Sequence, residues 1–220
     1  MDELKLCLVT DRAETRDRDL VEVVRECLGA GLRAVQLREK DLDAVEIAAL
    51  GRRLREATRE SGAWLILNDR VDVALSVGAD AVQRTSTSLP IREIRTLAGA
   101  TLRIGASVHS LEEAVAAERA GANWIVFGPI FDTPSKRRFG PPQGLAALAR
   151  VTARVALPVI AIGGITPGRV SDVMAAGAGG VAVISAILAA DSPPRATREF
   201  LDALAAWAND DHAGAPARTT

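Results

Sequence analysis

The chain has 220 residues, of which 48% are hydrophobic and 3% aromatic, and its formal net charge at pH 7 is −1. This balance gives no global electrostatic reason to bind nucleic acid or an anionic membrane. No segment approaches the roughly 18 consecutive apolar residues of a transmembrane helix. A single α/β domain is expected, because one α/β barrel commonly takes about 250 residues and scarce aromatics suit parallel strands covered by helices.

The two cysteines, Cys7 and Cys27, are far apart in the sequence and have no metal-ligating neighbours. This is typical of small buried side chains in a reducing compartment. The N-terminus also lacks a basic segment followed by a long apolar run. We therefore predict a cytoplasmic protein without a disulfide bond.

Short apolar runs alternate with amphipathic segments along nearly the whole chain. Apolar runs bounded by turn residues indicate buried strands, and apolar residues at i, i+3, i+4 and i+7 indicate helices. The expected strands are residues 6–11, 34–39, 64–69, 81–84, 103–108, 124–130, 158–164 and 180–187. One helix is expected to begin after Asp19, another at Thr166 and Pro167, and a short helical segment is expected before residue 81. The other expected helices are residues 43–61, 90–98, 111–120, 145–155 and 194–207. The domain is expected to span residues 1–208, and residues 209–220 are predicted to be a disordered tail.

Eight strands in strict alternation with helices favour a closed (β/α)8 TIM barrel. A glycine stands before each even-numbered strand, at Gly31, Gly78, Gly121 and Gly177. Each glycine suits the C-terminal end of a helix with positive φ, so the pattern indicates a βαβα unit used four times. An open parallel sheet remains the alternative, because a sequence pattern does not show closure.

In such barrels, ligands bind at the C-terminal ends of the strands. Amide, cationic and carboxylate groups are concentrated there in QLREK, residues 36–40, and in LILNDR, residues 65–70. The alternative roles are interior packing for Gln36 and helix capping for Asn68 and Asp69. Because both strands end in this way, we favour a ligand-binding role.

A long polar loop follows the strand that begins at Trp124, and such loops more often serve function than connection. Lys136 on this loop can reach an anionic group, and Thr133 and Ser135 offer hydroxyls. Together with the Asp69 carboxylate, this set indicates a polyphosphate bound with Mg²⁺. His109 is expected to orient a loop or cap a helix rather than to transfer a proton.

A phosphate subsite is expected at the ends of the last two strands. Gly163 and Gly164 allow close approach of backbone to ligand after strand seven, and Ile184 and Ser185 lie in strand eight. This is the position at which barrels bind phosphate.

The motifs LVTD, VQLREK, LILNDRVDVAL, GASVHSLEEA, GPIFDTPSK, PVIAIGGI and GVAVISAI occur in this order. As a set, they resemble the thiamine phosphate synthase and TenI-like superfamily over nearly the whole chain to about Ile187. The resemblance implies a synthase that joins hydroxymethylpyrimidine diphosphate to a thiazole phosphate and releases pyrophosphate. In that mechanism the diphosphate departs first, and the thiazole nitrogen captures the pyrimidine carbocation. Catalysis then consists mostly of charge neutralisation and substrate alignment.

The resemblance also implies roles for particular residues. Lys136 and Ser107 are the expected catalytic residues, Asp69 is the expected Mg²⁺ ligand, and a homo-oligomer remains open. The residues expected to hold the pyrimidine diphosphate are Gln36, Arg38, Glu39, Lys40, Asn68, Ser107 and Lys136. The residues expected to hold the thiazole phosphate are Thr133, Pro134, Ser135, Gly163, Gly164, Ile184 and Ser185.

The segment VQRTSTSLP, residues 82–90, departs from the synthase pattern. It has Gln83 in place of the family's His, and Ser88 in place of the Asp that is the second Mg²⁺ ligand. A hydroxyl brings no charge, so Ser88 is expected to be a weaker metal ligand than Asp. The segment resembles TenI-like proteins, which include thiazole tautomerases, yet Pro129 replaces the catalytic His of those enzymes and cannot transfer a proton. A synthase is therefore predicted, with a TenI-like tautomerase or a non-catalytic phosphate-binding homologue as alternatives.

Overall fold

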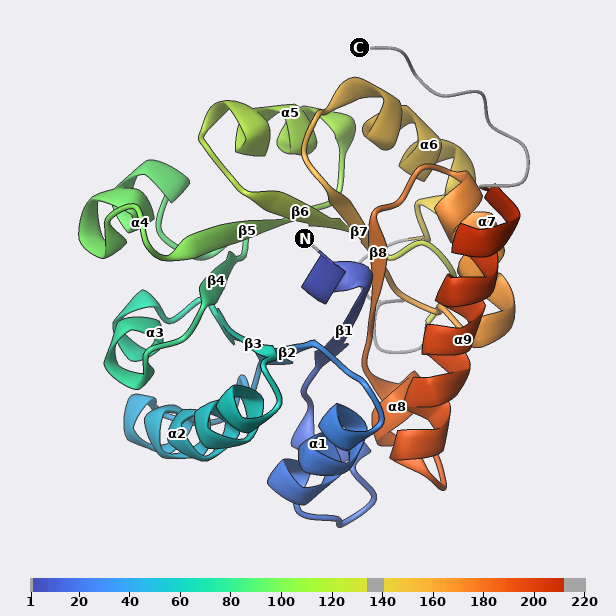
Figure 1. The fold of residues 1–220 in the computed structure, drawn as a ribbon. Helices are drawn as coiled ribbons and strands as arrows, with labels where there is room; N and C mark the ends of the chain where they lie inside the picture. Colours follow the sequence, from blue (N-terminus) through green and yellow to red (C-terminus); the bar gives the residue numbers. More distant parts are fainter. Residues whose placement is uncertain (1, 134–140, 212–220) are drawn as a thin grey trace.

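The computed structural model describes residues 2–133 and 141–211, and its eight parallel strands form a closed barrel in the order β1 to β8 (Figure 1). Strand β1 pairs with both β2 and β8, so that Cys7 lies opposite Ala34 on one side and opposite Ala182 on the other. This closure confirms the (β/α)8 barrel and excludes the open sheet. The strands are β1 Leu6–Val9, β2 Ala34–Leu37, β3 Trp64–Asn68, β4 Ala81–Arg84, β5 Arg103–Val108, β6 Trp124–Phe127, β7 Val159–Ile162 and β8 Gly180–Val183.

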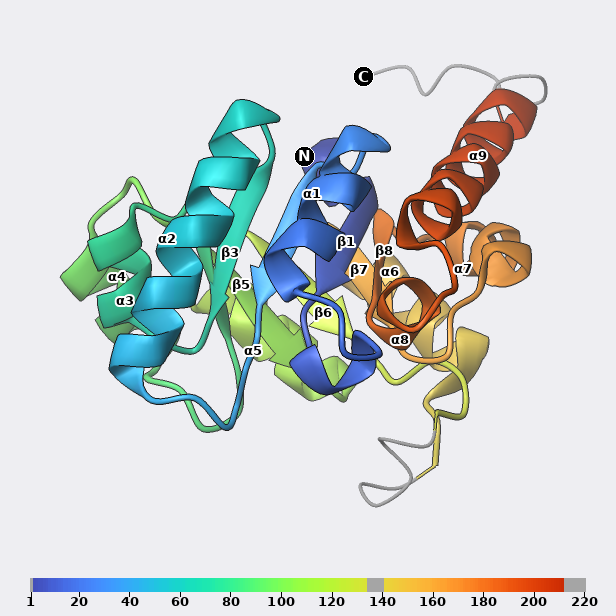
Figure 2. The same cartoon turned by 90° about the horizontal axis from the view of Figure 1, so that it is seen from below.

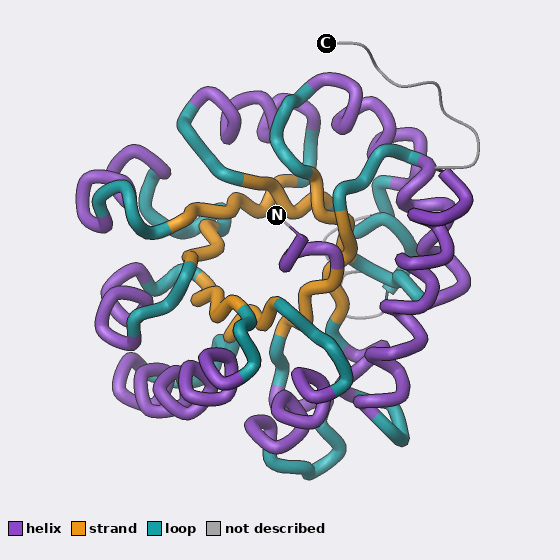
Figure 3. Tube along the Cα trace, in the orientation of Figure 1, coloured by secondary structure: helices purple, strands orange, loops and turns teal. Residues whose placement is uncertain are grey.

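The helices surround the ring of strands (Figures 1 and 3). They are α1 Leu20–Gly29, α2 Ala44–Glu60, α3 Val71–Val77, α4 Ile91–Ala98, α5 Leu111–Arg119, α6 Gly144–Arg154, α7 Val170–Ala175, α8 Ser185–Leu188 and α9 Pro193–Asp211, with 3-10 helices η1 Asp2–Lys5, η2 Arg12–Glu14 and η4 Pro167–Arg169. Helix α9 runs past the expected domain boundary at residue 208, and residues 212–220 lie outside the described part. Among the described residues, no helix combines the length and the apolar character needed to cross a membrane.

The glycines before the even-numbered strands adopt the backbone conformation that the sequence predicts. Their φ angles are +110° at Gly31, +65° at Gly78, +91° at Gly121 and +89° at Gly177. An L-residue with a side chain rarely adopts these values, so glycine ends each preceding helix and turns the chain into the next strand.

Side chains cap the N-terminal ends of α1 and α5. Asp19 caps α1 by accepting hydrogen bonds from the Val21 and Glu22 amides, and these bonds, the one from Glu22 above all, lower the pKa of the Asp19 carboxyl. Ser110 accepts a bond from the Glu113 amide at the start of α5. The Glu113 carboxylate accepts a bond from the His109 amide.

The expected eighth strand is too long. Strand β8 ends at Val183, and Ser185–Leu188 form the short helix α8. The backbone turns at Ile184, where φ is −121° and ψ is −93°, and the Leu188 amide donates to the Ile184 carbonyl at 2.9 Å. A short apolar run does not distinguish a strand from a buried helix, which explains the error. Strand β6 likewise ends at Phe127 rather than at residue 130.

The N-terminal end of the barrel is closed by η1 and by aromatic side chains. Figure 3 shows η1 within the ring of strands, and Leu4 is only 1% exposed. Gly180 permits this approach, because a Cβ there would lie 2.2 Å from the Leu4 carbonyl oxygen. Trp64 and Trp124 fill the interior with ring centroids 6.4 Å apart. These side chains and η1 therefore fill the N-terminal end of the barrel, and the opposite end, at the C-terminal ends of the strands, is the candidate ligand end.

Both cysteines are buried and free, as the sequence predicts. Burial raises the pKa of the Cys7 thiol to about 12 and that of the Cys27 thiol to about 11. Both thiols are therefore neutral at physiological pH and behave as small apolar side chains.

Gly105 on β5 supplies the space that Trp124 occupies. A Cβ at this position would lie 2.3 Å from Trp124 Cε2 and 2.2 Å from Gln83 Oε1. We predict that Gly105→Ala lowers the free energy of unfolding by about 1–3 kcal/mol, since overpacking forces a buried ring to move. Gly29→Ala is the matched control, because no atom lies within 4 Å of its added Cβ. Urea denaturation should show the control as stable as the parent or slightly more stable, and equal midpoints for the two variants would contradict the prediction.

Candidate active site

A row of polar side chains spans β2 to β5 at the C-terminal end of the barrel. Gln36 Nε2 donates to Asn68 Oδ1 at 3.0 Å, and Gln83 Nε2 donates to Ser107 Oγ at 3.0 Å. Asn68 and Gln83 are paired across β3 and β4, so the two hydrogen-bonded pairs are adjacent. Gln83 is 1% exposed, and its Oε1 has no hydrogen-bond partner within the described residues. We call these four residues the polar row.

Asp69 follows directly after β3 in a left-handed conformation with a φ of +69°. Its amide donates to the Gln83 carbonyl at 2.9 Å, which fixes Asp69 beside the end of β4. The next residue, Arg70, is paired with Asp72, and this hydrogen bond holds the pKa of Asp72 below its usual range. Helix α3 has Arg70 as its N-cap residue and no side-chain capping bond. The capping role considered for Asn68 and Asp69 is therefore wrong.

The expected diphosphate-binding segment, residues 38–40, is tied to the loop after β1. The Arg38 amide donates to Thr10 Oγ1 at 2.9 Å. Glu39 Oε2 accepts two bonds from Arg12, one from the backbone amide at 3.1 Å and one from Nε at 3.2 Å. The Glu39 side chain is thus engaged by Arg12. Sequence reasoning missed Arg12, since a single charged residue after a strand has the pattern of an ordinary solvated loop.

The base of the loop after β6 packs on the glycines that follow β7. The Ile130 amide donates to the Ile162 carbonyl at 2.9 Å, and the Phe131 amide donates to the Gly163 carbonyl at 3.0 Å. A Cβ on Gly163 would lie 2.6 Å from Pro129 Cβ, and one on Gly164 would lie 2.8 Å from the Asp132 carbonyl oxygen. These glycines therefore allow the base of the loop to pack closely, a role that differs from the phosphate binding that the sequence predicts for them.

The phosphate-side residues lie near one another around the ends of β7 and β8. Ile162 is paired with Ala182, so Gly164 and Ile184 follow at the same level of the barrel. Thr133 comes directly after Asp132, which contacts Gly164, and Ser185 is exposed at the start of α8. A short helix after strand eight is a recurring part of phosphate sites in barrels. The expected residues Pro134, Ser135 and Lys136 lie outside the described residues.

His109 holds the start of the loop after β6. Its Nδ1 donates to the Gly128 carbonyl oxygen at 2.7 Å, and its amide donates to Glu113 at 2.6 Å. Because a carbonyl oxygen only accepts, Nδ1 carries the hydrogen. The structural role expected for His109 is confirmed.

The candidate metal ligands are few. The structure brings together no group of three His, Cys, Asp or Glu side chains that could hold a metal ion, within residues 2–133 and 141–211. Ser88 Oγ accepts a bond from the Thr85 amide at 2.8 Å and shares another with Thr85 Oγ1 at 3.0 Å. Asp69 is therefore the main metal-ligand candidate among the described residues, and the Ser88 hydroxyl is already hydrogen-bonded to Thr85.

The closed barrel, the polar row, and Gly163 and Gly164 packed against the loop after β6 together define the class of protein. It is a (β/α)8 barrel with a candidate ligand site at the C-terminal ends of its strands. Comparison with known proteins then identifies the family, because a family model described as thiamine monophosphate synthase matches residues 6–187. A thiamine-phosphate synthase of Roseiflexus castenholzii is 43% identical over 90% of this chain and 87% of its own, and one of Methanoculleus marisnigri is 42% identical over 91% and 95%. The solved structure of a thiamine phosphate pyrophosphorylase from Pyrococcus furiosus is 39% identical, with a TM-score of 0.86 over 93% of this chain and 97% of its own. The chain belongs to the thiamine monophosphate synthase family.

The Gln36–Asn68 hydrogen bond allows a test of the polar row that does not depend on any reaction. We predict that Asn68→Ala lowers the free energy of unfolding by about 1–3 kcal/mol, because it leaves the buried Gln36 amide without its acceptor. The double variant Gln36→Leu/Asn68→Leu should recover much of that loss, since both polar groups are then absent. Urea denaturation of the three proteins measures the difference. A double variant less stable than Asn68→Ala would contradict the pairing.

Proposed function

We propose that this chain is a transferase that joins hydroxymethylpyrimidine diphosphate to a thiazole phosphate, forming thiamine phosphate and pyrophosphate. The observation that carries the proposal is the division of the barrel mouth into two parts. The polar row lies beside the cation-bearing segment 38–40, and the glycine turns and α8 lie across the barrel at the ends of β7 and β8. Two phosphorylated substrates require two such regions facing one reaction centre.

The pyrimidine side is assigned to the polar row and its neighbours. Gln36 and Asn68 offer amide groups to the ring, while Arg38 and Lys40 offer cations to the diphosphate. Ser107, held by Gln83, and Lys136 complete this set and stabilise the departing pyrophosphate. Glu39 belongs to this segment, but its Oε2 is bonded to Arg12, so we assign it no direct substrate contact.

The thiazole side is assigned to residues near the ends of β7 and β8. Thr133 follows Asp132, whose carbonyl oxygen lies against Gly164, and Pro134 and Ser135, which lie outside the described residues, are assigned to the same side by their place in the sequence. Ile184 and Ser185 supply backbone N–H groups where β8 passes into α8. A thiazole phosphate held at this side would have its ring nitrogen facing the pyrimidine side.

Mg²⁺ is the proposed cofactor, and the donor set fits it when the substrate contributes oxygens. Mg²⁺ in proteins is commonly held by one or two carboxylates, substrate phosphates and water. Asp69 provides one carboxylate and Ser88 one hydroxyl. When bound, the ion would supply positive charge to the leaving diphosphate. A cytoplasmic location, the absence of nucleic-acid or membrane partners and a homo-oligomeric assembly stay predictions from the sequence.

The turnover assay tests the proposal directly. Purified protein incubated with both substrates and Mg²⁺ should form thiamine phosphate, detected by fluorescence after oxidation. Asp69→Asn should reduce turnover by about 100-fold, on the order of 2.7 kcal/mol, because the leaving-group charge loses its main compensation. No product above a heat-killed control would exclude synthase activity. Conversion of the thiazole tautomer without a pyrimidine substrate would favour a tautomerase instead, which Pro129 argues against.

Ser88 allows a separate test of metal binding. We predict that Ser88→Asp lowers the Mg²⁺ concentration needed for half-maximal turnover by about tenfold, equivalent to about 1.4 kcal/mol. A second carboxylate adds a charged ligand, whereas the hydroxyl brings none. Ser86→Asp is the matched control, because Ser86 is exposed and the substitution adds the same negative charge to the same loop. An unchanged or weaker Mg²⁺ dependence in Ser88→Asp would rule out Ser88 as a ligand position.

A further inference from the structure

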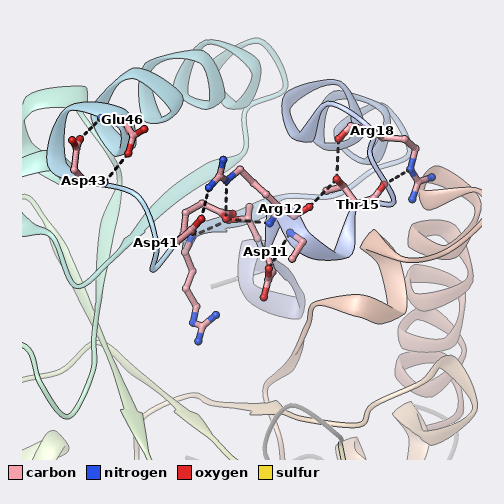
Figure 4. Close-up of polar contacts among 11 residues, drawn as sticks. Asp11, Arg12, Thr15, Arg18, Asp41, Asp43 and Glu46 are labelled. Atoms are coloured by element: carbon pink, nitrogen blue, oxygen red, sulfur yellow. Dashed lines mark hydrogen bonds and ion pairs between the residues drawn. The ribbon is translucent and has the colours of Figure 1, made fainter.

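Arg12 connects the loop after β1 to the segment after β2 through three hydrogen bonds. Its amide and Nε donate to Glu39 Oε2, and its Nη2 donates to Asp41 Oδ2 at 2.7 Å. Figure 4 shows Arg12 directed across the gap between the two loops toward Asp41. The residues before and after Lys40 are therefore both held by one guanidinium group.

Glu39 depends on this contact. Its side chain is 3% exposed, whereas the Arg12 side chain is 41% exposed. A buried carboxylate is costly without a cationic partner, and Glu39 Oε1 has no hydrogen-bond partner in the described part of the chain. Loss of the Arg12 side chain would leave Glu39 buried with a single hydrogen bond from the Arg12 amide. The segment 38–41 would then shift to expose the carboxylate to water.

Arg12 is itself held in place. Its carbonyl accepts hydrogen bonds from the Thr15 amide at 3.2 Å and from Thr15 Oγ1 at 2.9 Å, and Thr15 is 3% exposed. Asp11 accepts a bond from the Ala13 amide and caps η2 (Figure 4). These bonds hold the backbone of η2 at Arg12. A donor held on the loop after β1 can fix the position of the loop after β2.

We propose that Arg12 is a positioning residue that fixes segment 38–41, so that Arg38 and Lys40 present their charges to the diphosphate group. The inference rests on the proposed function, because the diphosphate is its ligand. Arg12 acts through Glu39 and Asp41 and needs no substrate contact of its own. Its loss should therefore weaken one substrate subsite and leave the other unchanged.

The first experiment measures binding of inorganic pyrophosphate by calorimetry at one fixed Mg²⁺ concentration. Arg12→Gln removes both side-chain hydrogen bonds and keeps the backbone one. We expect it to weaken pyrophosphate binding by about tenfold, while the affinity for inorganic phosphate plus thiazole alcohol stays within about twofold. Arg12→Lys should lie between the parent and Arg12→Gln, because it keeps the charge and loses the planar fork.

Arg53→Gln is the matched control. Arg53 is also a partly exposed arginine that pairs with a carboxylate, Asp19, at 3.3 Å, but that carboxylate is 48% exposed and does not need the pair to offset burial. Thermal unfolding measured in parallel identifies any variant that fails to fold. Pyrophosphate affinity in Arg12→Gln equal to that of Arg53→Gln would overturn the proposal, and so would an equal loss at both subsites.

Steady-state kinetics provide a second measurement. We expect Arg12→Gln to raise KM for the pyrimidine diphosphate by about tenfold with KM for the thiazole phosphate unchanged, and unchanged values for both would refute the positioning role. A parent protein that turns over nothing, but binds pyrophosphate with the expected Arg12 dependence, would refute the proposed function and support the positioning role. Turnover by the parent protein, with pyrophosphate binding and KM unchanged in Arg12→Gln, would support the proposed function and refute the positioning role.

Discussion

The pairing of β1 with both β2 and β8 is the interaction on which the rest of the structure depends. It closes the sheet, and closure brings the C-terminal ends of all eight strands to one rim. Figure 2 shows the loops after β1 and β2 at the lower edge of the molecule and the N-terminus at the upper edge. Residues distant in sequence, such as Gln36 and Ser185, therefore lie at the same end of the barrel.

Small residues make that closure possible and also determine where the loops go. Gly105 admits Trp124, Gly180 admits the N-terminal turn, and Gly163 and Gly164 admit the base of the loop after β6. In each case the added Cβ would lie within 3 Å of an atom of the neighbouring segment. Because a packed interior tolerates little displacement, these glycines connect barrel geometry to the shape of the ligand site.

The sequence predicted the architecture well, since strand and helix periodicity depend on nearest neighbours in the chain. Local patterns also located Gln36, Asn68 and Ser107 at strand ends. They failed at Ile184 and Ser185, where a continuous apolar run passes from strand β8 into helix α8. They also did not reveal that Glu39 is bonded to Arg12, because that contact joins residues 27 positions apart.

The distribution of charge at the barrel mouth follows from the same long-range contact. QLREK contains two cations and one anion, and a neighbouring carboxylate would ordinarily weaken their attraction for a diphosphate. Arg12 compensates the Glu39 charge within the protein, and Asp41 shares the same guanidinium. The carboxylate is thereby used to hold the loop. A sequence pattern shows five residues in a row, whereas the structure shows that one of them, Glu39, is bonded to Arg12 on the loop after β1.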